Sequence, residues 1–170
     1  MTKNELIEAL KLLGHKLKSK NLQGEIILTG GASMCLVHDA RDMTKDVDAL
    51  YEPKSVINDL VQEVSNELSL PFDWLNDSVK GFVNENLESD FLVNYDALKI
   101  SSVTPEYLLA MKLMSSRVEG QDYNDIKFLL NKLNIQKYDD AVSILEKYYP
   151  TELILPKTKY VIEECLMKEE

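Results

Sequence analysis

Two acidic residues separated by one position, Asp46 and Asp48, lie shortly after a pair of adjacent glycines, Gly30 and Gly31. Alternate residues of a β-strand point to the same face, so a strand over residues 46–51 would project both carboxylates together. Paired carboxylates can hold divalent metal ions, and the exposed amides of a glycine turn can hold phosphate. The spacing therefore indicates the chemistry of a magnesium-dependent site that handles nucleotides.

An acidic pair of this kind can also be an ordinary feature of an exposed strand edge. Like charges on one strand face repel each other, however, and a cation between them removes that repulsion. The order of strand, glycine pair, helix and acidic pair along the chain favours the metal-binding interpretation.

The segments that would position these residues alternate between strands and helices in the first part of the chain and are helical afterwards. Apolar runs bounded by Gly and Pro predict strands, and apolar residues at helical spacing predict helices. The predicted strands cover residues 25–29, 46–51, 91–95 and 98–103. The predicted helices cover an N-terminal segment and residues 32–38, 54–68, 105–117, 122–133, 138–148 and 157–167, with a short helix within 71–83.

This order of elements predicts an α/β (α+β) fold class, in which a small mixed β-sheet with flanking helices is followed by a C-terminal helical bundle. We expect residues 1–103 to form the α/β core and residues 104–170 the helical lobe, packed as one compact unit. A chain of 170 residues is long enough for one such domain and too short for two large independent ones.

The composition narrows the possible function classes. Apolar residues make up 45% of the chain, as in folded proteins, and the net charge of −10 argues against a surface that coats nucleic acid through bulk electrostatics. The cysteines, Cys35 and Cys165, form no CxxC motif, so neither a disulfide framework nor a zinc site is expected. No apolar run approaches the ~20 residues of a membrane span, and we expect a cytoplasmic protein without a membrane partner.

Leucines at helical spacing, with lysines between them, indicate that residues 1–20 form a helix of the domain rather than a signal peptide. Its charged residues are Lys3, Lys11, Lys16, Lys18 and Lys20, against Glu5 and Glu8. This excess of positive charge allows two interpretations, a solvated helix face or a local contact with nucleic acid.

The string LTGGASMCLVHDARDMTKDVDAL, residues 28–50, resembles the nucleotide-binding signature of the DNA polymerase β-like nucleotidyltransferase superfamily. In that superfamily a Gly-Gly or Gly-Ser turn precedes an Asp-x-Asp motif on the next strand. The string PEYLLAMKLMSSRVEGQDYNDIKFLL, residues 105–130, is similar to the second motif of minimal nucleotidyltransferases, including the abortive-infection (AbiEii-like) toxin type.

The resemblance implies a nucleotidyltransferase core and an enzyme that transfers a nucleoside monophosphate from a nucleoside triphosphate, such as ATP, to an acceptor hydroxyl. Gly30 and Gly31 would then hold the triphosphate through their backbone amides. Asp46 and Asp48 would be the catalytic residues that bind Mg²⁺ or Mn²⁺. Thr44 matches a hydroxyl position of the toxin-like members, where it would touch the γ-phosphate.

In the second motif, the resemblance implies that Lys112 reaches the nucleotide and that Asp122 or Asp125 fixes Lys112 or the neighbouring Arg117. Without the resemblance, the same residues would be interpreted as a structural ion-pair network between helices. Ser33 also has two interpretations, a phosphate contact or an ordinary residue of the first helical turn.

Many superfamily members carry a third carboxylate on a later strand, where it assists deprotonation of the acceptor hydroxyl. The candidates here are Asp90 and Asp96, although Asp96 with Ala97 is equally typical of a turn between two strands. If neither carboxylate faces the metal, the protein would bind nucleotide without transferring it, or would use Asp122 or Asp125 instead.

For toxin-like relatives the resemblance implies an RNA acceptor, especially the 3′ end of tRNA, a role in a toxin–antitoxin system, and a cognate antitoxin protein as partner. For other relatives it implies a protein hydroxyl or a small cationic antibiotic, which an acidic surface would attract. Two hypotheses from other classes stay open. One is a non-catalytic nucleotide-binding module, such as an antitoxin or regulatory partner, and the other is a structural α/β protein whose acids are surface residues.

Overall fold

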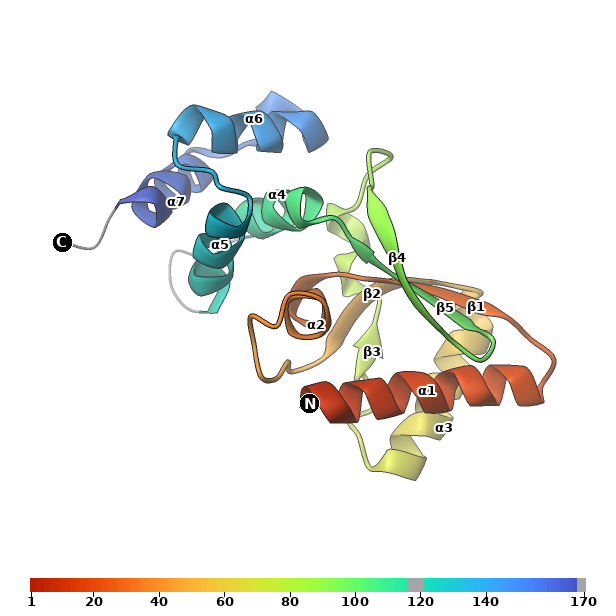
Figure 1. Cartoon of the computed structure of the whole chain (residues 1–170). Coiled ribbons are helices and arrows are strands. Elements are labelled where there is room, and N and C mark those ends of the chain that lie inside the picture. The colour runs from red at the N-terminus through yellow and green to blue at the C-terminus, as the bar shows by residue number, and fades with distance from the viewer. Residues whose placement is uncertain (116–120, 168–170) are drawn as a thin grey trace. The chain divides into compact units, whose positions relative to one another are not determined.

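The computed structural model describes residues 1–115 and 121–167, and the chain forms two compact units (Figure 1). The first unit consists of Met1–Gly81 with Ser89–Val103, and the second of Phe82–Glu88 with Thr104–Glu170. The short segment Phe82–Glu88 therefore leaves the first unit and the chain then returns to it. Each unit is described by itself.

The first unit is built on a five-stranded mixed sheet with the strand order β3-β2-β1-β5-β4. Its strands are β1 (Gly24–Leu28), β2 (Val47–Glu52), β3 (Leu75–Asn76), β4 (Ser89–Tyr95) and β5 (Leu98–Val103). The central strand β1 is antiparallel to β2 and parallel to β5, while β4 and β5 form an antiparallel hairpin. The predicted α/β fold class with a small mixed sheet is thus confirmed.

Three helices cover one face of this sheet, namely α1 (Lys3–Ser19), α2 (Gly30–Leu36) and α3 (Lys54–Leu68) (Figure 1). The leucine stripe of α1 is fully buried, and it packs with Ile26 and Leu28 of β1 into the core. Apolar residues at helical spacing bury one face of α1, while its lysines stay on the other. The core therefore lies between the sheet and these helices.

The strand register decides which side chains point into this core and which point away from it. Leu28 of β1 lies opposite Ala49 of β2 and opposite Ser102 of β5. Residues that are neighbours across a sheet point to the same face, and successive residues of one strand alternate. Ala49 is buried in the core, so the side chain of Asp48 points to the opposite face, which α1–α3 do not cover.

The prediction of a short helix within residues 71–83 is wrong for the first half of that segment. Residues Leu75–Asn76 form the edge strand β3, and only Ser78–Phe82 form a 3₁₀-helix, η1. The reason is Trp74, which is fully buried and donates a hydrogen bond from Nε1 to the carbonyl of Val61 at 3.2 Å. The Trp74 carbonyl in turn accepts from the amide of Val47 at 2.7 Å, which holds this segment against β2.

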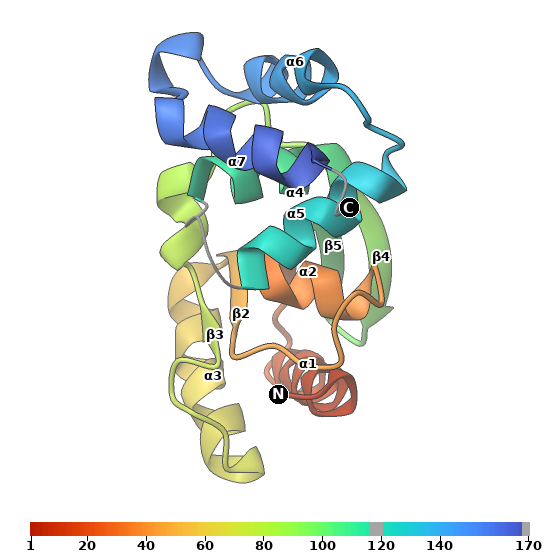
Figure 2. The same cartoon turned by 90° about the vertical axis from the view of Figure 1, so that its left-hand side faces the viewer.

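Among its described residues, 82–88, 104–115 and 121–167, the second unit contains four α-helices and a short 3₁₀-helix (Figure 2). They are α4 (Pro105–Ser115), α5 (Gln121–Lys132), α6 (Tyr138–Tyr148), η2 (Thr151–Leu153) and α7 (Pro156–Leu166). Helices α5, α6 and α7 all pack on α4, whose residues 107–113 are buried without interruption. The C-terminal helical bundle is thus present, although the predicted end of its first helix, Arg117, lies outside the described residues.

Hydrogen bonds join the segment Phe82–Glu88 to three tyrosines of the second unit. The Asn84 side chain donates to the Tyr148 carbonyl at 2.7 Å, and the Asn84 amide donates to the Tyr107 hydroxyl at 3.2 Å. Tyr149 donates its hydroxyl to the Phe82 carbonyl at 2.6 Å. These contacts connect the segment to α4 and to the end of α6.

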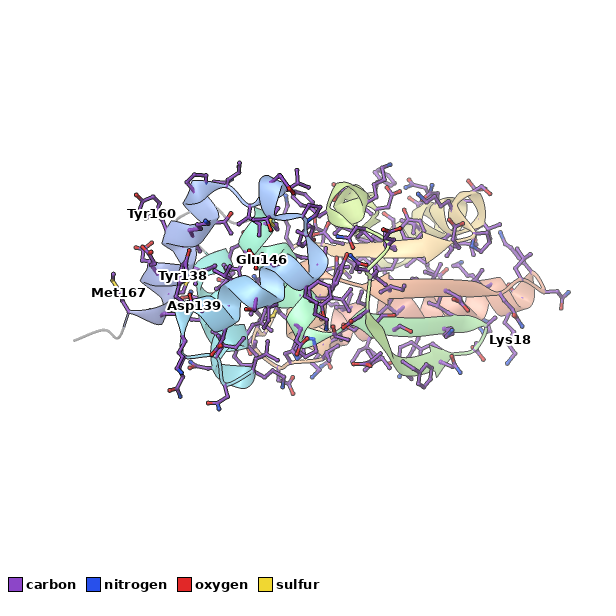
Figure 3. The ribbon with its side chains drawn as sticks, turned by 90° about the horizontal axis from the view of Figure 1, so that it is seen from above. Lys18, Tyr138, Asp139, Glu146, Tyr160 and Met167 are labelled. Atoms are coloured by element: carbon purple, nitrogen blue, oxygen red, sulfur yellow. The ribbon has the colours of Figure 1, made fainter. Side chains whose placement is uncertain are left out.

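Surface residues of the second unit include Tyr160 of α7, which Figure 3 labels and which is 69% exposed.

Among the helices within residues 1–115 and 121–167, none has the length and apolarity that a membrane-spanning helix requires.

The Asn84 contacts generate a prediction about stability. Asn84→Ala removes the donor to the Tyr148 carbonyl, and we expect the free energy of unfolding to fall by about 1–2 kcal/mol because a lost hydrogen bond leaves a poorly solvated acceptor. Urea denaturation followed by far-UV circular dichroism measures this change. The matched control is Asn131→Ala, at an exposed position of α5, which should leave the unfolding midpoint almost unchanged. Equal midpoints for the two variants would contradict the role assigned to Asn84.

Candidate functional site

The glycine turn that begins α2, directly after β1, lies against Asp48. Gly30 has a φ of +50°, a conformation that glycine adopts without strain. A Cβ atom at this position would lie 3.3 Å from Oδ2 of Asp48. The hydroxyl and the amide of Thr29 both donate to the Asp48 carbonyl, at 2.8 Å and 3.0 Å. The turn and the carboxylate are therefore fixed next to each other by backbone contacts.

The second glycine, Gly31, lies still closer to its neighbours, which belong to the loop that leads into β2. A Cβ atom at Gly31 would lie 2.5 Å from Oγ1 of Thr44 and 3.1 Å from Nη1 of Arg41, so even an alanine would displace a neighbour. Thr44 is 5% exposed and donates its hydroxyl to the Asp46 carbonyl at 2.9 Å. The hydroxyl of Thr44 has a single proton, which it already donates to Asp46. A hydrogen bond from Thr44 to a γ-phosphate oxygen would therefore require this proton to turn away from the Asp46 carbonyl.

The two acids of the Asp-x-Asp motif stand close enough to influence each other. Asp46 lies one residue before β2, so the strand begins later than the sequence predicts. Partial burial raises the pKa of the Asp46 carboxyl, and the negative charge of Asp48 raises this pKa further, while Lys45 opposes the rise. The pair is a site of crowded negative charge that a cation would stabilise.

This donor set suits a hard divalent cation such as Mg²⁺ or Mn²⁺, because carboxylate oxygens are the ligands that these ions prefer. Within residues 1–115 and 121–167, no cluster of three or more His, Cys, Asp or Glu side chains could hold a metal ion. Magnesium is commonly bound by one or two carboxylates together with substrate phosphates and water. Asp46 and Asp48 fit a metal ion that also binds a phosphate held at the adjacent glycine turn.

Two polar residues beside Asp48 were not identified from the sequence. Asn76 of β3 lies opposite Asp48 in the strand register, and Ser78 begins η1. The Ser78 hydroxyl lies 3.0 Å from Oδ1 of Asp48 and close to Oδ1 of Asn76, which also accepts the Ser78 amide at 3.0 Å. A strand of two residues carries no periodic pattern, so nothing in the sequence indicated this neighbourhood.

Arg41 is a further residue that the sequence analysis missed. Its guanidinium lies beside the glycine turn, as the distance to the Gly31 position shows. A guanidinium is well suited to phosphate because its donors match two oxygens at once. The only signal in the sequence was its place three residues before Thr44, on the loop that leads to the acidic pair.

Ser33 is directed into the protein. It is fully buried, its hydroxyl hydrogen-bonds to the hydroxyl of Ser102 at 2.7 Å, and its amide donates to the Thr29 carbonyl at 3.1 Å. Both polar groups are thus engaged within the first unit. The geometry favours the interpretation of Ser33 as a helix residue that joins α2 to β5.

The two candidates for a third carboxylate do not share the face of Asp48. Asp90 of β4 lies opposite Ser102, and Ser102 points toward α2 on the helix-covered face. Asp96 lies in the turn between β4 and β5 with a φ of +52°, at the opposite end of β5, and it pairs with Lys18 at 2.9 Å. The register therefore places neither acid beside Asp48, and Asp96 is the turn residue that the sequence allowed.

The residues of the second motif meet in the second unit. Nζ of Lys112 lies 2.6 Å from Oδ1 of Asp122 and 2.9 Å from Oδ2 of Asp125. Lys112 is 8% exposed and Asp125 only 2% exposed, so this is a largely buried charge cluster between α4 and α5. Both acids fix Lys112, which fits a positioned nucleotide-binding lysine as well as a structural ion pair. Arg117 lies outside the described residues.

The lysines of α1 have partners within the first unit. Lys18, labelled in Figure 3 near the end of α1, pairs with Asp96. The other contacts are Lys3 with Asp39, Lys16 with Glu63 and Glu67, Lys20 with Glu63, and Lys11 over the ring of Tyr95. These pairs neutralise much of the positive charge and favour the interpretation of α1 as a solvated helix face.

The buried charge cluster generates a prediction. Lys112→Met removes a cation that contacts both Asp122 and the buried carboxylate of Asp125, and we expect the free energy of unfolding to fall by about 3–5 kcal/mol. Urea denaturation followed by circular dichroism measures the loss. Lys132→Met, at an exposed position of α5, is the control and should change stability by less than about 0.5 kcal/mol. If both variants unfolded at the same urea concentration, the cluster would not contribute to the free energy of unfolding.

Comparison with known proteins assigns the chain to a family. Residues 4–154 match the family described as "Nucleotidyltransferase of unknown function (DUF6036)". No curated protein and no solved structure matches the chain. The match covers most of the 170 residues and includes the glycine turn, the acidic pair and the Lys112 cluster. The chain therefore belongs to this family of nucleotidyltransferases.

Proposed function

We propose that this protein is a metal-dependent nucleotidyltransferase that moves a nucleoside monophosphate from a nucleoside triphosphate to an acceptor hydroxyl. The observation that supports it most is the contact between Gly30 and Asp48, because it brings a turn that can hold phosphate against a carboxylate that can hold a metal ion. The family membership supports the same class of reaction.

In this reaction the acceptor oxygen attacks the α-phosphorus of the nucleoside triphosphate and forms a new O–P bond. The bond between the α-phosphorus and the oxygen that bridges to the β-phosphate breaks, and pyrophosphate leaves with the bonding electrons. The proton of the acceptor hydroxyl passes to solvent. A bound divalent ion would supply charge neutralisation of the triphosphate and of the leaving group.

The residues of the first unit have separable tasks in this proposal. The backbone at Gly30 and Gly31 admits the triphosphate because no side chain occupies the turn. Asp46 and Asp48 hold the metal ion, and Arg41 binds phosphate oxygens beside Gly31. The role of Lys112, which Asp122 and Asp125 hold within the second unit, stays a prediction of the resemblance. Catalysis then consists mainly of positioning and charge compensation.

The second part of the proposal concerns the molecule that carries the acceptor hydroxyl. The toxin-like resemblance points to RNA, in particular the 3′ end of tRNA, with an antitoxin as protein partner. The lysines of α1 are paired with acids of the first unit, so an RNA phosphate that bound there would have to displace those acids. A protein hydroxyl or a small cationic acceptor is the alternative, which the net charge of −10 favours.

The glycine turn provides the first test. Gly31→Ala would place a methyl group 2.5 Å from the Thr44 hydroxyl and so displace Thr44 from the Asp46 carbonyl. We expect a loss of about 1–3 kcal/mol in unfolding free energy and weaker nucleotide binding. Thermal unfolding with and without ATP and Mg²⁺ measures both effects, since a bound ligand raises the melting temperature.

Gly81→Ala is the matched control for this variant, because a Cβ atom at Gly81 would meet no atom of the described residues within 4 Å. It should keep both the stability and the shift that ATP and Mg²⁺ produce. A Gly31→Ala protein that retained the full shift would show that the triphosphate is held elsewhere.

The decisive experiment incubates the protein with each α-³²P-labelled nucleoside triphosphate, Mg²⁺ and total tRNA, and a parallel reaction omits the tRNA. Asp48→Asn keeps the size of the side chain and removes its charge, so we expect transfer to fall by at least about 100-fold while the fold is retained. Chelation of the metal with EDTA should have the same effect. Asp59→Asn, an exposed acid on α3, should transfer normally.

The location of the label distinguishes the acceptors. Label on tRNA that disappears with Asp48→Asn supports an RNA acceptor, and label on protein in the reaction without tRNA supports a protein hydroxyl. Metal-dependent nucleotide binding without label on any acceptor would favour the non-catalytic module. Equal transfer by the parent protein and Asp48→Asn would refute the assignment of this site.

A further inference from the structure

We propose that Ser78 is a positioning residue that orients the carboxylate of Asp48 for metal binding, a role that rests on the proposed function. The two oxygens of this carboxylate have different surroundings. Oδ1 lies 3.0 Å from the Ser78 hydroxyl, whereas Oδ2 lies on the side of the Gly30 turn. Ser78 therefore holds one oxygen and leaves the other directed toward the place where a phosphate would be held.

The hydroxyl of Ser78 has one proton and two acceptors within reach, Asp48 and Asn76. The contact with Asn76 is the shorter one, but a carboxylate carries a full negative charge and accepts a stronger hydrogen bond than an amide oxygen, so we assign the proton to Asp48. Asn76 serves another purpose, since its Oδ1 accepts the backbone amide of Ser78 at 3.0 Å and so fixes the start of η1.

Backbone pairing positions this arrangement. Asp48 lies opposite Asn76 in the parallel register of β2 and β3, so the two side chains share a face of the sheet. The neighbouring pair, Val47 and Leu75, is buried on the other face, which prevents β3 from shifting by one residue. The buried Trp74 anchors the same segment. Ser78 is thus brought to Asp48 by the fold of the first unit.

Such a contact matters because the terminal torsion of an aspartate is soft, and its carboxylate rotates unless a partner fixes it. Hydrogen bonds to the non-ligating oxygen orient metal-binding carboxylates, and their loss commonly lowers metal affinity by about 10–100-fold. Ser78 is exposed, and so we expect a loss near the lower end, about 10-fold.

Binding of Mn²⁺ alone tests the inference without reference to catalysis. The electron paramagnetic resonance signal of free Mn²⁺ is recorded while the metal is titrated into each protein. Ser78→Ala should lower the Mn²⁺ affinity about 10-fold, and Ser78→Thr, which keeps the hydroxyl, should restore it to near the parent value. The melting temperature without metal should be the same for all three proteins, which separates positioning from a general effect on folding.

Two further variants sharpen the comparison. Ser55→Ala, at an exposed position of α3, is the control and should bind Mn²⁺ as the parent does. In the background of Asp48→Asn, the additional change Ser78→Ala should have no further effect, because a residue that acts through Asp48 has nothing left to orient.

The outcomes distinguish this inference from the proposed function. If Asp48→Asn abolishes Mn²⁺ binding while Ser78→Ala binds as tightly as the parent, the positioning role is overturned and the metal site remains. If the parent protein binds no Mn²⁺, the inference is overturned together with the metal site of the proposed function. A loss in Ser78→Ala that Ser78→Thr reverses supports the positioning role.

Discussion

The absence of side chains at Gly30 and Gly31 is the constraint on which the candidate site depends. One glycine lies against the carboxylate of Asp48 and the other against the hydroxyl of Thr44. A Cβ atom at Gly31 would lie closer to Thr44 than real Cβ contacts allow, so the turn, the loop before β2 and the acidic pair form a single packed arrangement. The positive φ of Gly30 fits this requirement, since it lets the chain turn sharply from β1 into α2.

The register of the mixed sheet then decides which acids can act together. Because Ala49 points into the core, Asp48 must point to the face that α1–α3 leave uncovered. The same rule directs Asp90 to the other face, since it aligns with Ser102, and the hairpin turn carries Asp96 to the other end of β5. A shift of one residue would exchange these faces, and the buried alternation of β2 opposes such a shift.

The sequence was sufficient wherever a regular pattern repeats. The bounds of α3 and α6 agree with the predicted residues 54–68 and 138–148, because apolar spacing and flanking prolines mark them clearly. The fold class and the neighbourhood of Gly30 and Asp48 followed from the order of strand, turn and strand. The strand β3 could not be predicted, since two residues have no period and their pairing depends on where Trp74 is buried. Arg41, Asn76 and Ser78 were missed for the same reason, because their proximity arises from tertiary packing.

The small number of protein ligands has a consequence for how the proposed site would work. Within residues 1–115 and 121–167, no third His, Cys, Asp or Glu side chain joins the acidic pair in a metal-binding group, so a metal ion bound there would fill the rest of its shell largely with water or phosphate oxygens. In the proposed site, the closeness of Asp48 to the glycine turn would bring those phosphate oxygens within reach of the same ion. Metal and nucleotide would therefore bind more tightly together than either alone, and the coupling is reciprocal by necessity. An arrangement with only two carboxylates would thus bind a divalent ion by itself, but less tightly than it binds the ion together with its nucleotide.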